Sequence, residues 1–185
     1  MRHILYIIGA AVALVAALLI LVHTGLPNRS AYTGLIIAGE RPVAPELQAF
    51  APNFTLLNTD GDRIQLEDLR GSPVIVNFWA TWCGPCIVEM PTLQSIFESH
   101  QASGLRVLAI NMGESADTIK AWQQTHQLTY DLLVDEQQKV AAQYYLRGQP
   151  STYVISPEGV ITSIFFGPIQ ESTLNAALDQ YRGTL

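Results

Sequence analysis

The chain has 185 residues, a formal net charge of −6, and 49% hydrophobic residues. This length suits one ordinary domain with short appendages. The acidic balance argues against a nucleic-acid-binding surface, so we predict no nucleic-acid partner.

An uncharged apolar run over residues 4–22 forms most of the N-terminus. As a helix it would be about 28 Å long, close to the roughly 30 Å of a bilayer core. The run is longer than the apolar region of an ordinary secretory signal peptide, and no small-residue cleavage site follows it. We therefore predict an uncleaved transmembrane signal-anchor over residues 1–25, with a cleaved signal peptide as the alternative.

The topology of this anchor follows from the few charges beside it. Arg2, His3 and the terminal amine precede the apolar run, and by the positive-inside rule they place the N-terminus in the cytoplasm. The catalytic part of the chain is then extracytoplasmic, in a single-pass protein of the cell membrane. Disulfide chemistry is common in such a compartment.

The segment after the anchor, residues 26–49, holds three prolines and two glycines, a composition typical of a linker. A short strand is expected at residues 35–37. We place the folded domain at residues 50–185. The domain opens with a β-hairpin, because β-rich stretches at residues 54–57 and 64–66 flank a loop of turn-forming residues.

Beyond the hairpin, apolar runs bounded by turn residues alternate with segments of helical periodicity. The pattern predicts strands at residues 74–79, 105–112, 132–134, 151–155 and 160–166. It predicts helices at residues 85–99, 115–126, 136–145 and 170–182. The resulting order, βαβαβαββα after the hairpin, is typical of an α/β fold whose sheet has an antiparallel edge.

The only two cysteines, Cys83 and Cys86, stand where the first of these strands leads into a helix. Pro85 suits the first helical turn, where its missing N–H would have no partner. Cys83 then lies at the helix N-terminus, where free N–H groups and the helix dipole favour a thiolate. Cys86 follows on the same helical face, so the two sulfurs can form a disulfide. An exposed nucleophilic sulfur beside a second thiol predicts thiol–disulfide exchange, with both cysteines catalytic.

Other uses of a cysteine pair fit this sequence less well. A zinc site would need further ligands, and the nearest histidine, His100, lies at the far end of the same predicted helix. A c-type haem site would need a histidine where Ile87 stands. A purely structural disulfide stays open as an alternative, although so short a loop gains little stability by the loop-entropy model. We predict no metal and no other cofactor.

The sequence around the cysteines, NFWATWCGPC at residues 77–86, resembles a thioredoxin active site, and Pro91 resembles the proline of the thioredoxin active-site helix. The motifs APNF at residues 51–54, DLRG at 68–71 and EMP at 89–91 extend this likeness. Together with the anchor, they make the chain similar to the TlpA/ResA-like group of membrane-anchored thiol–disulfide oxidoreductases. The resemblance covers the whole predicted domain. It implies a thioredoxin-like fold, a central mixed sheet flanked by helices, with an N-terminal β-hairpin and a central insertion.

The resemblance also implies roles for individual residues. Gln149 and Pro150 match the cis-proline loop that faces the cysteines and binds substrate backbone, with an ordinary trans proline as the alternative. Trp82 is expected to pack at the rim of the site, shield Cys83 and contact substrate. Glu89 matches a glutamate that tunes or shuttles the cysteine proton, with a solvated helix glutamate as the alternative.

The predicted activity is therefore protein-disulfide reduction outside the cytoplasm, because the Gly84-Pro85 dipeptide matches that of thioredoxin, a reductant. The resemblance implies exported disulfide-bearing clients, such as apocytochrome c, and a membrane thiol electron donor. One alternative is a peroxiredoxin-like thiol peroxidase, for which Thr81 is a poor match. Another is a copper-delivery or binding module, for which no histidine is placed as a third ligand. An oxidase or isomerase would differ only in reduction potential.

Overall fold

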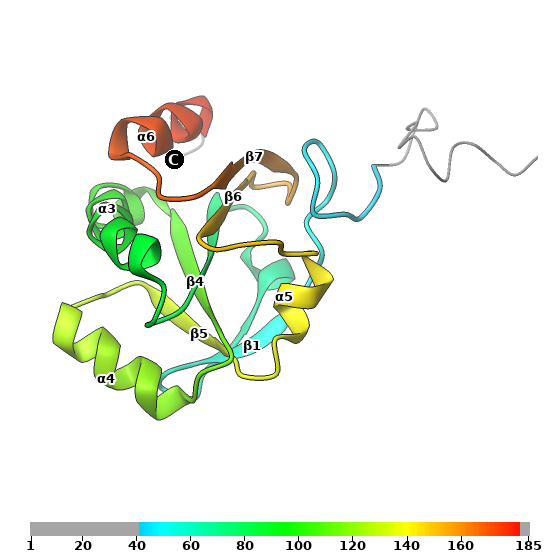
Figure 1. Ribbon diagram of the computed structural model, residues 1–185. Helices are drawn as coiled ribbons and strands as arrows, with labels where there is room; N and C mark the ends of the chain where they lie inside the picture. The colour runs from blue at the N-terminus through cyan, green and yellow to red at the C-terminus, as the bar shows by residue number, and fades with distance from the viewer. Residues whose placement is uncertain (1–40, 182–185) are drawn as a thin grey trace, which may run out of the picture. The chain divides into compact units, whose positions relative to one another are not determined.

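A computed structural model describes residues 41–181 of the protein (Figure 1). The predicted anchor and the predicted strand at residues 35–37 lie outside this range. No helix within residues 41–181 combines the length and the apolar character that crossing a bilayer requires.

The core of the domain is a seven-stranded mixed sheet with the order β2-β1-β5-β4-β3-β6-β7. Three strands run parallel at its centre: β3 (Val74–Trp79), β4 (Arg106–Met112) and β5 (Asp131–Asp135). The outer strands pair antiparallel: β1 (Thr55–Asn58), β2 (Arg63–Gln65), β6 (Ser151–Ile155) and β7 (Ile161–Phe166). The predicted α/β fold, its opening hairpin and its antiparallel edge are thus confirmed.

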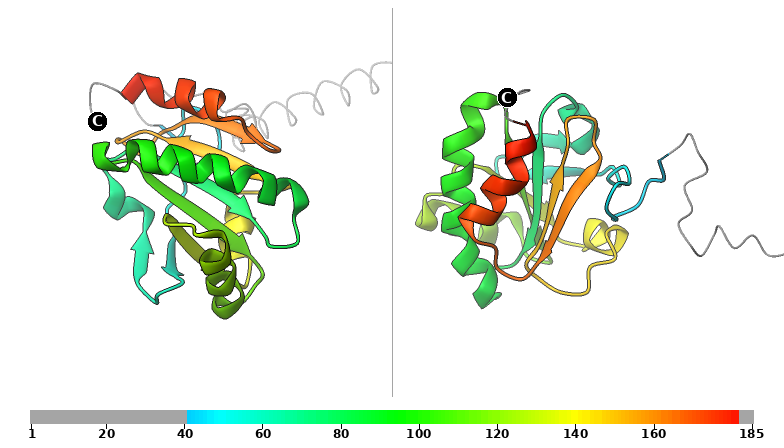
Figure 2. Two further views of the ribbon diagram at one scale, coloured as in Figure 1. Left: turned by 90° about the vertical axis from the view of Figure 1, so that its left-hand side faces the viewer. Right: turned by 90° about the horizontal axis from the view of Figure 1, so that it is seen from above.

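The helices cover both faces of this sheet. They are α3 (Gly84–His100), α4 (Ala116–His126), α5 (Lys139–Gln143) and α6 (Glu171–Leu178). Short 3-10 turns follow α3 at Gln101–Ser103 and α6 at Asp179–Tyr181, and another lies between β2 and β3 at Leu66–Leu69. Figure 2 shows α3 and α6 together on one face and α5 on the other.

Strand β3 is buried along its whole length because helices lie over both of its faces. Its side chains alternate between two apolar clusters, as the two-residue period of a strand requires. Ile75 and Trp79 join the cluster under α3, α4 and α6, whereas Val76 and Phe78 join the cluster under α5. The same alternation directs Asn77 toward α3, which places a polar side chain beneath the active-site helix.

Helix α5 is shorter than the predicted helix at residues 136–145. The Asp135 carboxylate accepts hydrogen bonds from the backbone N–H groups of Lys139 and Ala141, both at 2.9 Å, and so fixes where the helix begins. Gln138 before it and Tyr145 after it adopt left-handed backbone conformations, with φ of 54° and 48°, that a helix cannot continue through. The predicted last helix likewise ends as an α-helix at residue 178 and continues as a 3-10 turn.

The chain just before residue 50, which we predicted as the end of the linker, hydrogen-bonds to the edge strand β7. The backbone N–H of Gln48 donates to Ile161 O over 2.8 Å, and the N–H of Ile161 donates to Ala49 O over 2.9 Å. Ala49 is buried. These contacts cover the beginning of an exposed sheet edge, which would otherwise present unpaired backbone groups.

Candidate active site

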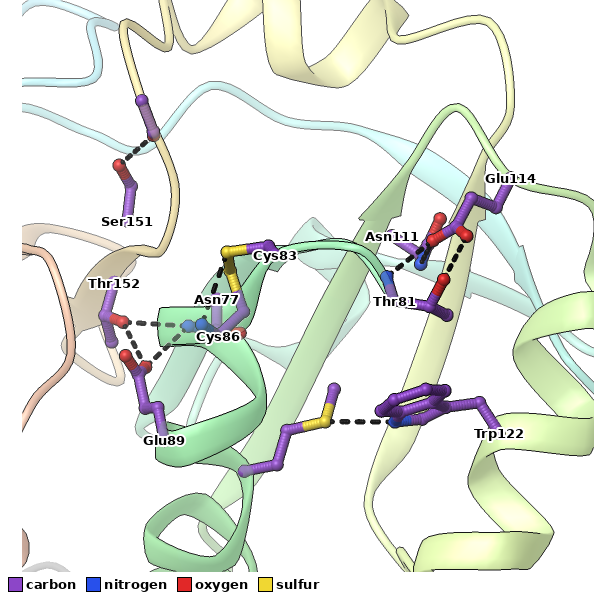
Figure 3. Close-up of a disulfide and its surroundings, with 12 residues drawn as sticks. Asn77, Thr81, Cys83, Cys86, Glu89, Asn111, Glu114, Trp122, Ser151 and Thr152 are labelled. Atoms are coloured by element: carbon purple, nitrogen blue, oxygen red, sulfur yellow. Dashed lines mark hydrogen bonds between the residues drawn. A yellow bond between two sulfur atoms is a disulfide. The ribbon is translucent and has the colours of Figure 1, made fainter.

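Cys83 and Cys86 form a disulfide at the N-terminus of α3, with their Cα atoms 5.3 Å apart (Figure 3). Cys83 is the N-cap residue, and its Sγ accepts a hydrogen bond from the backbone N–H of Cys86 over 3.2 Å. Pro85 occupies the first turn. The N–H of Cys86 at the helix start therefore points at the sulfur of Cys83, which would stabilise a negative charge on it.

In this oxidised form both cysteine residues are buried. Cys83 is 5% exposed and Cys86 is 2% exposed, because the bridge packs against the apolar cluster beneath α3. The sequence predicted an exposed sulfur on Cys83, and in the disulfide that prediction is wrong. Trp82, directly before Cys83 in the chain, is 71% exposed.

A buried carboxylate lies one helical turn beyond Cys86. Glu89 is 1% exposed, and its Oε1 accepts hydrogen bonds from Asn77 Nδ2 over 2.8 Å and from the Thr152 hydroxyl over 3.0 Å. Asn77 Nδ2 also donates to Thr152 Oγ1 over 3.0 Å (Figure 3). The other oxygen, Oε2, has no hydrogen-bond partner among residues 41–181. The alternative of a solvated helix glutamate is excluded by this burial.

Burial raises the pKa of Glu89 from 4.5 to about 7, and the hydrogen bond from Thr152 and the influence of the Ile169 backbone N–H oppose that rise only in part. A carboxyl group with this pKa exchanges its proton near neutral pH, as a proton donor or acceptor in catalysis must. The pKa of Tyr130 is also raised, mainly by burial and in addition by the negative charge of Glu89 on the same side of the sheet.

The loop before β6 lies beside the end of β3. The Gln149–Pro150 peptide bond is cis, and Pro150 O accepts a hydrogen bond from the backbone N–H of Gly167 over 2.9 Å. Ser151 pairs with Phe78 in the sheet register. Phe78 lies only five positions before Cys83 in the chain. The structure thus brings the proline loop and the cysteine-bearing helix to the same end of the sheet.

A groove beside this end of the sheet links two residues that the resemblance implied as substrate contacts. Trp82 forms one part of its lining and Gln149 another, with apolar side chains between them that include Met112 and Leu146. Gln149 Nε2 has no hydrogen-bond partner within the described chain. The groove therefore offers apolar surface between Trp82 and Gln149.

A second acidic residue at the site was not found from the sequence. Glu114 accepts hydrogen bonds from the backbone N–H of Thr81 and from Asn111 Nδ2, both over 2.7 Å, and from the Thr81 hydroxyl (Figure 3). Partial burial would raise the pKa of Glu114, but these hydrogen bonds outweigh it and hold the pKa below its usual value. An acid two residues after a strand matches no motif, so only the folded arrangement reveals it.

Within residues 41–181 no group of three or more His, Cys, Asp or Glu side chains is arranged to hold a metal ion.

Thioredoxin-fold thiol–disulfide oxidoreductases are the class that combines this mixed sheet, a CxxC disulfide at a helix N-terminus and a neighbouring cis-proline. Residues 47–164 match the AhpC/TSA family, and the chain belongs to that family. Within it, the chain is a ResA-like thiol–disulfide oxidoreductase of the thioredoxin superfamily, as its relatives indicate.

Two curated relatives come from Bacillus subtilis. The thiol-disulfide oxidoreductase ResA is 34% identical over 125 residues, which cover 68% of this chain and 70% of ResA. The thioredoxin-like protein YneN is 34% identical over 132 residues, covering 70% of this chain and 76% of YneN.

Solved structures share the fold. A thiol:disulfide interchange protein of the thioredoxin family from Chlorobium tepidum superposes with a TM-score of 0.66 at 25% identity, covering 77% of this chain and 98% of that one. StoA from Bacillus subtilis superposes with a TM-score of 0.61 at 21% identity, covering 74% and 98% of the two chains. The thioredoxin-like fold implied by the sequence motifs is thereby confirmed.

Proposed function

We propose that the protein is an extracytoplasmic reductant of protein disulfides that works through the Cys83–Cys86 dithiol. The observation that carries this proposal is the disulfide at the start of α3, with the sulfur of Cys83 directed at a helix N-terminus. A sulfur in that position is stabilised as a thiolate, which is the form that attacks disulfides.

In the reduced enzyme, the Cys83 thiolate attacks one sulfur of a substrate disulfide and the other substrate sulfur leaves as a thiolate. This forms a mixed disulfide between Cys83 and the substrate. The Cys86 thiol then loses its proton and attacks Cys83 Sγ, which releases the second substrate sulfur. Overall, one substrate disulfide becomes two thiols and the enzyme dithiol becomes a disulfide.

Glu89 takes the proton that Cys86 must lose. It lies one turn beyond Cys86, it is buried, and its pKa of about 7 lets it accept a proton at neutral pH and release it again. Asn77 and Thr152 hold the carboxylate in place. Substituting Glu89→Gln should therefore slow the resolution of the mixed disulfide, because glutamine cannot accept the proton of Cys86.

The groove at the rim binds the polypeptide around the substrate disulfide. Trp82 offers an exposed indole, and Gln149, whose peptide bond to Pro150 is cis, lines the same groove. Backbone pairing at the cis-proline loop would align the substrate without requiring a particular side-chain sequence.

The location and the partners follow from the apolar run at residues 4–22 and from the family. We infer that this run anchors the protein in the cell membrane, with the thioredoxin-like domain outside the cytoplasm. Oxidised enzyme would then be recharged by a membrane thiol electron donor. Exported proteins with disulfides, such as apocytochrome c, are the clients we propose.

Redox equilibration of the full chain in detergent against dithiothreitol or glutathione tests the direction of the reaction. A reductant should have a potential near the value of about −270 mV found for thioredoxin. A potential near about −120 mV, as in the oxidant DsbA, would overturn the reductant assignment.

Two further assays separate this proposal from its alternatives. Fast reduction of insulin disulfides with slow consumption of hydrogen peroxide supports a disulfide reductase, and the reverse result supports a peroxiredoxin-like peroxidase. Titration of the reduced protein with copper tests the metal-delivery alternative, since a delivery module should bind the ion tightly through both thiolates.

A further inference from the structure

We propose that Glu114 is a positioning residue that clamps the active-site loop and so holds Cys83 over the N-terminus of α3. This inference rests on the proposed function and deepens it. The carboxylate of Glu114 accepts three hydrogen bonds, two from Thr81 and one from Asn111. Figure 3 shows this cluster on the opposite side of the disulfide from the Glu89 cluster.

A contact at Thr81 directly affects the conformation of the active-site loop. It stands two residues before Cys83, in the short connection between the end of β3 and the start of α3. The backbone N–H of Cys83 donates to Ala80 O over 3.1 Å, so the connection is a tight turn. Because Glu114 binds both the N–H and the hydroxyl of Thr81, it fixes the backbone that leads directly into Cys83.

Asn111 supplies independent support. It lies within β4, is fully buried, and pairs in register with Trp79 of β3. A buried amide in an apolar strand costs free energy unless its groups are hydrogen-bonded. Its Nδ2 donates to Glu114, whereas its Oδ1 has no partner in the described chain. The one polar contact that this side chain makes is thus the contact that holds the Glu114 carboxylate.

The turn that delivers Glu114 is also specific. Gly113 has a φ of +85°, a left-handed conformation that favours glycine, and its N–H donates to Asp135 O over 3.1 Å. A Cβ atom at this position would lie only 2.8 Å from Gln138 Nε2. The chain therefore reverses sharply after β4, which brings the next residue, Glu114, to the active-site loop.

The carboxylate has two opposing effects on a Cys83 thiolate. Its negative charge disfavours a second negative charge nearby, but three donors already compensate that charge. By fixing the loop, it keeps Cys83 Sγ within hydrogen-bond distance of the Cys86 N–H, and this favours the thiolate. The positioning effect is the larger one, so loss of the carboxylate should weaken the thiolate.

The test compares the pKa of Cys83 among reduced full-length variants in a Cys86→Ser background, measured from the pH dependence of alkylation by iodoacetamide. Glu114→Gln should raise the pKa of Cys83 and slow alkylation at neutral pH by about threefold or more. Thr81→Val should act in the same direction but less, because the backbone N–H remains. Thr81→Ser should restore the wild-type value. Glu136→Gln, at an exposed glutamate, is the matched control for charge and should change nothing.

An unchanged or lowered pKa of Cys83 in Glu114→Gln would overturn the inference, since a lowered value means that charge repulsion dominates. Thermal unfolding of each variant, followed by circular dichroism, identifies any that fail to fold, and Thr81→Val then serves alone. Insulin reduction by the wild-type chain is measured separately. If it fails, the proposed function fails, whereas the pKa comparison still decides the role of Glu114.

Discussion

Asn77 Nδ2 donates a hydrogen bond to Glu89 Oε1 over 2.8 Å and thereby joins the middle of the buried strand β3 to the active-site helix. An acidic residue in place of Asn77 would repel the Glu89 carboxylate, whereas the amide of Asn77 stabilises it. Asn77 thus supports the buried carboxyl group of Glu89 without adding a second charge beside it. The behaviour of that group with pH can be predicted.

Glu89→Gln should alter how the stability of the oxidised protein depends on pH. The pKa of Glu89 rises from 4.5 to about 7 on folding, so the folded protein binds this proton more tightly than the unfolded chain does. Raising the pH between these two values therefore removes stability, by up to about 3 kcal/mol once Glu89 is ionised. Glutamine carries no such charge, and the variant should gain stability relative to wild type as the pH rises.

Urea unfolding at a series of pH values measures this difference. Glu98→Gln, an exposed position on the same helix, is the matched control and should run parallel to wild type at every pH. Parallel curves for Glu89→Gln and wild type would show that the Glu89 carboxyl group titrates normally, contrary to its burial.

Thr152→Val should raise the pKa of Glu89 further. The hydroxyl of Thr152 donates to the carboxylate over 3.0 Å and lowers its pKa, and valine keeps the shape of the side chain without the donor. Thr152→Ser, which keeps the hydroxyl, should stay close to wild type. The pKa is measured by NMR titration of the Glu89 side-chain carbon. A pKa that falls in Thr152→Val would mean that another donor replaces the hydroxyl.

The sequence was sufficient to predict the parts of the fold that depend on local pattern. The apolar run of β3, the cysteine pair after it and the hairpin before β7 all appear where periodicity and turn residues place them. The late start of the third predicted helix was missed, because the Asp135 cap and the left-handed Gln138 are decided by tertiary geometry. Periodicity reports neither feature.

In the candidate site, too, some residues could be predicted from local sequence and others could not. The positions of Cys83 and Cys86 follow from spacing alone, and the interest of Glu89 follows from family resemblance. The burial of Glu89 depends on Thr152, which is 63 residues away in the chain, so no local pattern could reveal it. Glu114 reaches Thr81 across 33 residues and carries no motif. Contacts between distant strands and loops were therefore the part that sequence reasoning could not supply.

Trp82→Ala should separate substrate binding from chemistry. The indole is 71% exposed, so its loss should change the free energy of unfolding by less than about 0.5 kcal/mol. As part of the groove it should contact polypeptide substrates, and its removal should slow insulin reduction by about tenfold. Reduction of a small disulfide such as oxidised glutathione should be unaffected. Leu57→Ala, 52% exposed on β1 and outside this groove, is the control. Equal loss on both substrates would mean that Trp82 acts on Cys83 itself.

Cys83→Ser and Cys86→Ser should fail at different steps, because the two sulfurs have different surroundings. Cys83 caps the helix and receives the Cys86 N–H, so it should be the attacking thiolate, and Cys83→Ser should be inactive without any mixed disulfide. Cys86→Ser keeps the attacking sulfur but cannot resolve the product, so it should accumulate a mixed disulfide with substrate. Non-reducing electrophoresis followed by mass spectrometry identifies the bonded cysteine. Trapping through Cys86 in Cys83→Ser, with none in Cys86→Ser, would reverse the two roles and contradict the mechanism, because the helix N-terminus would then not be selecting the nucleophile.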